Sequence, residues 1–302
     1  MMHLHLPVAE MSIFVPELFS VALIIGMIAG LLGISGGFIL TPFMIALGIP
    51  ATIAVGSSGG QVFASSYASF TAYRKNKIID YKLTTYLTIG GIIGIASGIL
   101  IFHYLSSIGH IENILRISFI ILLSFVGLLM VAHTPQNNTP QPSPVHQKTN
   151  PKFMLFFTKS YFSKADCHTS IFMLMSSGLV IGTISGLLGI GGGFLIVPTL
   201  IYILKVPARA ALAVSQTHIM CISFLGLFMH SYFNQNVDPI LSLLLVFSGV
   251  TGAMIGTRFS TKLPQKATRL IFSTVIFGTV LYLIYDTFYA VELEYIATRL
   301  PL

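Results

Sequence analysis

Residues 26–42 read GMIAGLLGISGGFILTP, and residues 182–198 read GTISGLLGIGGGFLIVP. Aligned at an offset of 156, the two stretches agree at 11 of 17 positions. The register continues downstream, with small shifts, through these pairs: Pro50 with Pro207, Ser58 with Ser215, Gln61 with His218, Gly91 with Gly249. A repeat of roughly 120 residues is too long for the unit of a solenoid, but it is a natural size for half of a duplicated transporter. The chain therefore contains an internal duplication.

The composition is that of a membrane protein. Of the 302 residues, 54% are apolar and only 8% are charged, and the mean hydropathy is +0.87. An ordinary soluble domain is about a quarter charged. A soluble fold with so few charges would expose apolar surface over much of its area, which excludes the usual globular enzyme. We expect an all-α polytopic membrane protein whose main surroundings are the lipid bilayer.

Eight apolar segments fall on either side of a proline-rich stretch. They cover residues 18–47, 50–73, 83–107, 112–132, 170–204, 207–233, 239–262 and 268–290. The stretch between the fourth and fifth segments holds five prolines from Pro135 to Pro151, so it cannot bury enough apolar surface to fold. We therefore predict a first transmembrane repeat over 18–132, a flexible linker over 133–169 and a second transmembrane repeat over 170–290.

The first segment of each half is too long for a single crossing. Residues 18–47 would form a helix of about 45 Å, against a hydrocarbon core of about 30 Å. Glycines interrupt both copies where the helix becomes too long, at 36–37 and at 191–193, and a proline follows each break. We predict a broken, re-entrant helical hairpin in each half. Each half then adds three full crossings, so the two repeats are inverted.

The basic residues support this topology. With two hairpins, 14 of the 16 Lys and Arg residues fall on one face, and only Arg116 and Arg299 fall on the other. Eight simple crossings would instead divide them 9 to 7. Cytoplasmic loops are rich in Lys and Arg, so the crowded face and the linker are expected in the cytoplasm of an inner (plasma) membrane, with both termini outside. The net charge of +7 is explained by these loops, and we expect no nucleic-acid partner.

The two glycine-rich breaks are the first candidates for a substrate site. Irregular backbone inside a membrane is tolerated only where it is buried in protein or lines a watery cavity, and the start of a half-helix favours an anion. The candidate residues at the breaks are Ser35, Gly36, Gly37, Gly191, Gly192 and Gly193. Close helix packing through small residues is the alternative. We expect that alternative for Gly26, Gly30, Gly182 and Gly186.

Polar residues at the next helix of each half complete the candidate site. Ser57, Ser58, Gln61, Ser215 and Gln216 are neutral groups that could bind a partly dehydrated anion without trapping it, although hydrogen bonds between helices would use the same residues. His218 is the titratable side chain expected deepest in a crossing. It is a candidate proton carrier, with a neutral histidine bonded to a neighbour as the alternative. We expect His230, near a helix end, at the membrane interface.

Enzyme chemistry is not expected. Residues 33–37 formally match GxSxG, which would make Ser35 the nucleophile of an intramembrane protease. The second copy has Gly191 in place of Ser35, and His218 has no evident acidic partner. The nine histidines are scattered without metal-ligand spacing. We predict no catalytic residue, no metal and no cofactor.

The doubled motif G-x-x-x-G-L-L-G-I-x-G-G-F-x-x-x-P resembles the TauE/SafE sulfite exporter family, over roughly residues 18–132 and 170–290. The resemblance implies a bacterial-type permease that moves sulfite, sulfonates or other small organic anions without ATP hydrolysis. From the two inverted halves, we expect transport by alternating access. The family's second motif is closer to A-x-G-T-S, whereas residues 54–58 read AVGSS and residues 211–215 read ALAVS. This departure leaves the anion open. An anion channel, an uptake carrier of the same fold and a homodimeric assembly also remain open.

Overall fold

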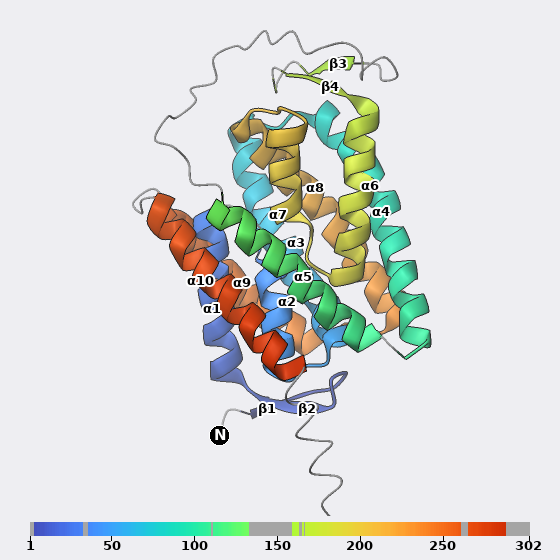
Figure 1. Cartoon of the computed structure of the whole chain (residues 1–302), viewed down its shortest axis with the longest axis vertical. Helices are drawn as coiled ribbons and strands as arrows, with labels where there is room; N and C mark the ends of the chain where they lie inside the picture. Colours follow the sequence, from blue (N-terminus) through green and yellow to red (C-terminus); the bar gives the residue numbers. More distant parts are fainter. Residues whose placement is uncertain are drawn as a thin grey trace, which may run out of the picture.

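A computed structural model describes residues 3–32, 36–109, 111–132, 159–162, 165, 167–260 and 265–287. The described part is almost wholly helical (Figure 1). The elements are β1 (His3–Leu6), β2 (Met11–Phe14), α1 (Val15–Leu32), α2 (Gly37–Ala46), α3 (Ala51–Lys75), α4 (Tyr81–Ser107), α5 (Ile111–Ala132), β3 (Lys159–Phe162), β4 (Cys167–Ser170), α6 (Ile171–Leu188), α7 (Gly193–Pro198), the π-helix η2 (Thr199–Ile203), α8 (Ala208–Met229), the π-helix η3 (His230–Asn234), α9 (Pro239–Ser260) and α10 (Gln265–Tyr285).

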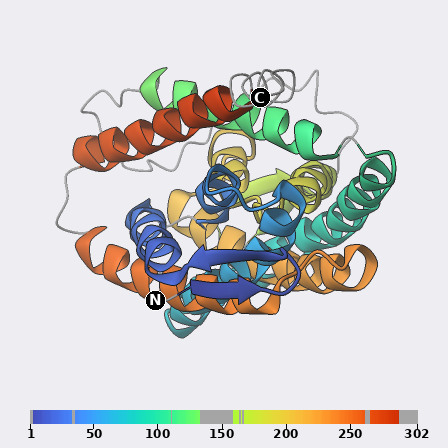
Figure 2. The same cartoon turned by 90° about the horizontal axis from the view of Figure 1, so that it is seen from below.

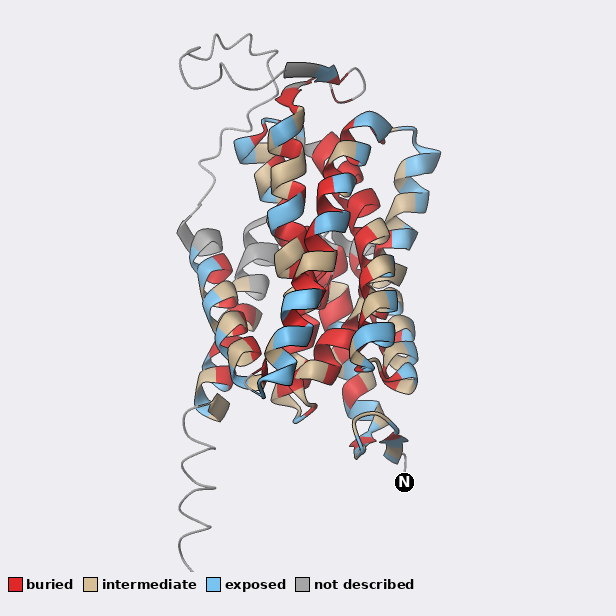
Figure 3. Ribbon diagram, turned by 90° about the vertical axis from the view of Figure 1, so that its right-hand side faces the viewer, coloured by how far each residue is buried: buried red, intermediate tan, exposed pale blue. Residues whose placement is uncertain are grey.

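The helices have the length and the surface of membrane spans. Within the described residues, five stretches are long and apolar enough to cross a bilayer: Tyr81–Ser107, Ile111–Leu128, Ile171–Leu188, Ala210–Asn234 and Pro239–Gly256. Large apolar side chains face outward, among them Leu100, Ile121, Phe228, Phe247 and Leu281, each more than half exposed. Figure 3 shows buried residues along the interior and exposed ones on the outer helix surfaces. This surface suits lipid, so the chain is an all-α polytopic membrane protein, as predicted.

The helix ends gather at two opposite ends of the molecule (Figure 1). At one end, the backbone N–H of Val8, in the turn between β1 and β2, donates to Asp238 Oδ2 at 2.9 Å. At the other end, the N–H of Ala165, between β3 and β4, donates to Asp80 Oδ2 at 3.1 Å. The two aspartates also accept N–H groups from the first turns of α9 and α4. We call these ends the β1–β2 end and the β3–β4 end.

Each broken segment returns to the end from which it starts. Met11 to Phe14, just before α1, lie beside Leu47 and Ile49, just after α2. In the second half, Thr169 Oγ1, just before α6, donates to the carbonyl of Leu204, just after η2, at 3.1 Å. The first segment therefore begins and ends at the β1–β2 end, and the second at the β3–β4 end. This geometry is what inverted halves would produce.

Glycines bring two pairs of helices into close contact. α1 packs along α9, and α4 packs along α6. A Cβ atom placed on Gly26 of α1 would lie 2.9 Å from the Cα atom of Gly249 in α9, and one placed on Gly182 of α6 would lie 2.6 Å from the carbonyl oxygen of Gly91 in α4. Gly30 and Gly186 meet backbone in the same way. These four glycines therefore serve close helix packing, as expected.

Part of the expected linker is ordered. Residues 159–162 and 167–170 pair as the antiparallel strands β3 and β4, and all of them except Ser170 lie within the stretch 133–169 that we expected to be flexible. Residues 133–158, which hold the five prolines, lie outside the described residues. A similar hairpin, β1–β2, precedes α1. Each half therefore begins with a two-stranded hairpin ahead of its first helix.

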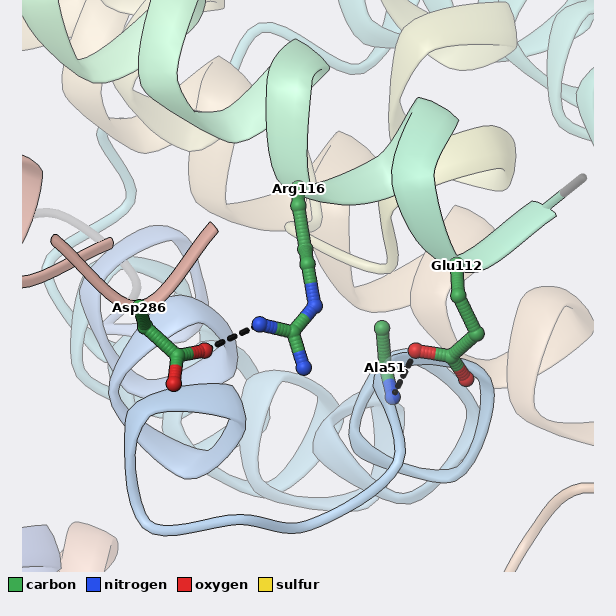
Figure 4. A network of polar contacts seen from close by, with 4 residues as sticks. All are labelled: Ala51, Glu112, Arg116 and Asp286. Carbon is green, nitrogen blue, oxygen red and sulfur yellow. Dashed lines mark hydrogen bonds and ion pairs between the residues drawn. The ribbon is translucent and has the colours of Figure 1, made fainter. Parts of the chain in front are cut away.

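α5 and α10 lie side by side along one edge of the molecule, away from β1–β2 (Figure 2). Near the start of α5, Arg116 forms an ion pair with Asp286, just past the end of α10 (Figure 4). One turn earlier, Glu112 accepts the backbone N–H of Ala51 at 3.0 Å and that of Thr52 at 3.3 Å. A carboxylate at the start of a helix satisfies N–H groups that lack helical partners. α5 thereby connects the start of α3 to the end of α10.

Candidate functional site

The two glycine-rich breaks meet in the interior. Phe38, directly after Gly37, stacks on Phe194, directly after Gly193, with ring centroids 4.7 Å apart. Both phenylalanines are buried. A Cβ atom on either Gly37 or Gly191 would run into a methyl group of Val62 in α3. The starts of α2 and α7 therefore converge on the same part of α3.

The second break depends on glycine for its backbone. Gly189, Gly191 and Gly192 have φ angles of 66°, 69° and 69°, in the left-handed region that side chains with a Cβ rarely adopt. The first break differs, because Gly36 has a φ of −73° and caps α2 in a right-handed conformation. Ser35, the serine of the first break, lies outside the described residues. The two breaks are therefore related in sequence but not identical in shape.

The predicted serines and amides are distributed over several contacts. Ser58 Oγ donates to the carbonyl of Gly189 at 3.0 Å, so it ties α3 to the second break. Ser57 Oγ instead accepts the N–H of Asp238 at 2.9 Å, at the start of α9. Ser215 Oγ donates to the carbonyl of Leu212 in its own helix. Gln216 is buried. Among the three serines, Ser58 donates a hydrogen bond to a glycine break.

Gln61 and His218 occupy matching positions against matching glycines. Gln61 is 1% exposed, and a Cβ atom on Gly249 of α9 would lie 2.6 Å from its Cγ atom. His218 is fully buried, and a Cβ atom on Gly91 of α4 would lie 3.0 Å from its Nε2 atom. Two residue pairs matched by the repeat in the sequence thus recur as two contacts in the structure.

Both side chains carry a polar atom without a partner. Gln61 Oε1 and His218 Nε2 are buried, and no described residue forms a hydrogen bond with either. The other ring nitrogen of His218, Nδ1, lies 3.3 Å from Thr88 Oγ1. The Gln61 amide also lies at the start of α2, because a Cβ atom on Gly36 would be 3.4 Å from Nε2. Buried polar atoms are nearly always paired, so these two indicate a missing partner such as a ligand or water.

A small cavity lies beside the second break and was not anticipated. Its volume is about 20 Å³, room for about one water molecule. Ser185, Ser223 and His230 line it together with residues of α3 and the break. His230 is 3% exposed, so its side chain lies inside the protein and not at the membrane interface, where we expected it. The quoted repeat contains Ser185, but no motif marks Ser223 or His230.

The groups near the breaks that could bind an anion are neutral. Within the described part of the chain, the buried carboxylates are Asp80 and Asp238, and both accept backbone N–H groups at helix starts. Among the residues whose side chains are described, no Lys or Arg is buried. The same part contains no group of three His, Cys, Asp or Glu side chains that could hold a metal ion. Helix starts, amides, hydroxyls and imidazole are therefore the chemistry present.

Comparisons with known proteins give the family. The model of the family described as "Sulfite exporter TauE/SafE" matches residues 18–283. The chain is similar to "Probable membrane transporter protein MJ0441" of Methanocaldococcus jannaschii, at 27% identity over 288 residues, 88% of this chain and 94% of the relative. It is also similar to "Probable membrane transporter protein YjnA" of Bacillus subtilis, at 24% identity over 261 residues, 84% and 93% of the two chains.

A further relative is a "Probable membrane transporter protein" of Xylella fastidiosa, strain Temecula1, at 26% identity over 270 residues, which cover 87% of this chain and 92% of the relative. No solved structure matches the chain. The helical fold, the paired glycine breaks and the match over residues 18–283 agree with one another. The protein therefore belongs to the TauE/SafE sulfite exporter family of membrane transporters.

Proposed function

We propose that the protein is a secondary transporter, working as an exporter, that moves a small anion such as sulfite, a sulfonate or another organic acid anion by alternating access. The observation that carries the proposal is the pair Gln61 and His218, two buried side chains at matching positions, each with an unpartnered polar atom. The description of the family as exporters supports the direction.

The anion site combines the two breaks with these side chains. Gly36 and Gly37 place the start of α2 beside Gln61, and the positive end of a helix dipole favours an anion there. Gly191, Gly192 and Gly193 form the opposing break. Ser35, Ser57, Ser58, Ser215 and Gln216 complete the proposed set, with Ser58 acting through its bond to the second break. Neutral groups of this kind bind an anion without holding it too tightly for release.

No Lys or Arg is buried among the residues whose side chains are described, and this favours a singly charged anion. Desolvating an ion costs more as its charge rises, and a divalent anion such as sulfate would need a compensating cation in a buried site. A monovalent oxyanion can be held by hydrogen bonds and helix ends alone. We therefore expect monovalent sulfonates and sulfite in its singly protonated form to be preferred over sulfate.

Flux in proteoliposomes tests this proposal. Purified protein is reconstituted, and counterflow of labelled sulfite, sulfate, methanesulfonate and acetate is measured. Hydrogen bonds to a charged group contribute about 1.5–3 kcal/mol, so Gln61→Leu and His218→Leu should each weaken anion affinity by roughly 10- to 100-fold. The matched control is Thr217→Val, because the Thr217 hydroxyl donates to the carbonyl of Ala213 within its own helix. This control should transport within about twofold of wild type.

The outcomes separate the site from the function. If the wild-type protein shows counterflow and both Gln61→Leu and His218→Leu show the same flux as wild type, the site lies elsewhere. No counterflow of any anion by folded wild-type protein would refute the transport function. Single-channel currents in place of saturable exchange would identify an anion channel.

The orientation in the membrane is part of the proposal. The first turns of α4 and α8 and the last turns of α3 and α9 hold basic residues and lie at the β3–β4 end. By the bias of Lys and Arg toward the cytoplasm, we assign the β3–β4 end and residues 133–158 to the cytoplasmic side of the inner membrane. Reporter fusions after residue 302 and within residues 136–150 should then report opposite sides of the membrane. The same side for both would refute this orientation.

A further inference from the structure

We propose that His230 is the binding site for a proton that moves with the anion. This inference rests on the proposed transport function and adds the coupling ion to it. His230 lies where α8 passes into η3, and its imidazole lines the cavity beside the second glycine break. The ring also meets the ring of Phe102 in α4 edge to face, with centroids 5.0 Å apart. A buried imidazole at a cavity that is wide enough for water can exchange a proton with it.

A chain of hydrogen bonds connects His230 to the surface. His103, an exposed residue near the end of α4, has Nδ1 3.0 Å from Asn234 Oδ1. The amide nitrogen of Asn234, Nδ2, lies 3.3 Å from His230 Nδ1. His230 Nε2 in turn lies 3.0 Å from the carbonyl oxygen of Gly186. α4 runs away from the β3–β4 end, so the chain opens at the β1–β2 end, which we assign to the outer side.

The donors and acceptors in this chain fix the proton of the neutral His230. An amide nitrogen only donates and a carbonyl oxygen only accepts. Asn234 Nδ2 therefore donates to His230 Nδ1, and His230 Nε2 carries the ring proton and donates to Gly186. By the same reasoning, His103 Nδ1 donates to Asn234 Oδ1. Every bond in the chain points from the surface toward α6.

Adding a proton to His230 reverses part of the chain. The new N–H on His230 Nδ1 would face Asn234 Nδ2, which is also a donor. Protonated His230 therefore needs an acceptor where Nδ2 now lies. Rotation of the Asn234 amide would offer its Oδ1 as that acceptor and would then require His103 Nδ1 to accept from Nδ2. Protonation of His230 is thereby coupled to the state of His103 at the surface.

A carbonyl at the end of α6 faces His230. Gly186 lies in the last turn of α6, and the carbonyls of a C-terminal turn carry partial negative charge. A histidine cation at such a position is attracted to these carbonyls. The proton would sit at the negative end of α6, whereas the anion would sit at the positive start of α2. The pair is neutral overall, which lowers the cost of moving both through the protein.

Among the described residues, His103 is the titratable group connected to His230. Phe102 of α4 contacts the His230 ring directly, and His103 of α4 is connected to it through Asn234. Gly186 of α6 accepts its hydrogen bond. The residues of α3 that share its cavity are Val55, Gly56, Gly59 and Val62, which do not titrate. His218 differs, because its recorded hydrogen bond is to Thr88 alone, and it does not line the cavity. The structure therefore favours His230 over His218 as the proton carrier.

Accumulation driven by a pH gradient tests the proposal. Methanesulfonate is the probe, since it stays a monovalent anion between pH 5 and 8 and adds no titration of its own. One proton per anion predicts about tenfold accumulation per unit of pH gradient in wild type, because a tenfold ratio corresponds to about 1.4 kcal/mol. His230→Gln should keep counterflow but lower the accumulation ratio to about one. The His218→Gln variant should reach the same accumulation ratio of methanesulfonate as wild type, even if it transports more slowly.

Several outcomes would overturn the inference. The first is an accumulation ratio in His230→Gln that equals the wild-type ratio. The second is a wild-type protein that exchanges methanesulfonate but takes up no protons, as measured with a pH dye inside the vesicles. Absence of all counterflow in wild type would instead refute the proposed function.

Two variants at the exposed His103 give a test that does not rely on the folding of the His230 variant. His103→Lys can only donate to Asn234, and it should move the midpoint of pH-driven uptake to lower pH. His103→Glu can only accept, and it should move the midpoint to higher pH. Both shifts should persist at high salt, which screens the direct charge effect. Equal midpoints in the two variants would refute the role of the chain.

Discussion

Replacing Gly94 by alanine would drive a methyl group into the backbone of α6. The Cβ atom would lie 2.9 Å from the backbone nitrogen of Thr183 and from the carbonyl carbon of Leu179, and closer still to the Leu179 oxygen. These are backbone atoms of a packed helix, so they cannot rotate away as a side chain would. α4 and α6 must separate by roughly 1 Å, because carbon atoms in ordinary contact are about 3.5–4 Å apart. The contacts along the whole α4–α6 interface would be lost or lengthened.

The magnitude follows from two opposing effects. Alanine is better than glycine inside a helix by about 1 kcal/mol. Overpacking costs about 1–3 kcal/mol where neighbours can adjust, and more where they are backbone. We expect a net loss of about 2 kcal/mol in the free energy of unfolding, which corresponds to a fall in Tm of about 3 °C for a chain of 302 residues, because the unfolding entropy is about 2.1 cal/mol/K per residue.

Thermal unfolding in detergent measures this change, with Gly278→Ala in α10 as the matched control. A Cβ atom on Gly278 meets no atom within 4 Å, so only the helix-propensity gain applies there, and Tm should stay equal or rise by about 1–3 °C. If Gly94→Ala melts at the temperature of the control, the close contact between α4 and α6 is not present in solution and the glycine-packing explanation is wrong.

Three further substitutions test the contacts at the β1–β2 end. Asp238→Ala removes the cap of α9 and the hydrogen bond that holds Val8, so it should lower the free energy of unfolding by about 2–3 kcal/mol. It should also speed proteolysis of residues 3–14, and an unchanged cleavage rate would contradict the role of Asp238 in holding this segment. Glu112→Gln should lower stability by about 1 kcal/mol at neutral pH, since it removes the charge at the start of α3, and an equal Tm would argue against capping. Arg116→Met should change stability by less than about 1 kcal/mol, because its ion pair is about a quarter exposed, whereas a larger loss would show a deeper role.

The sequence predicted the parts of the fold that depend on local chain chemistry. The two breaks occur between α1 and α2 and between α6 and α7, at the glycine clusters, because a run of glycines near a proline cannot continue a helix that is already long enough to cross a bilayer. The pairing of Gln61 with His218 followed from the duplication alone. The inverted orientation stays a prediction that the helix ends support.

The remaining features depend on contacts between distant residues. Ser57 and Ser58 are neighbours in sequence, but successive helix positions point about 100° apart, so one meets the start of α9 and the other meets the second break. His230, Asn234 and His103 come together only because η3 packs against α4. The hairpins β1–β2 and β3–β4 are four residues per strand, too short for a reliable alternating pattern.

The two aspartate-bound hairpins dock at different times during synthesis of the chain. Ala165 follows Asp80 by 85 residues, so β3–β4 can dock as soon as it leaves the ribosome. Val8 precedes Asp238 by 230 residues, so β1–β2 must wait until more than half of the second repeat has been made. At about 5–20 residues per second the delay is roughly 10–50 s. The first hairpin is therefore exposed to proteases and chaperones through most of translation, and its docking reports that the chain has been made as far as the start of α9.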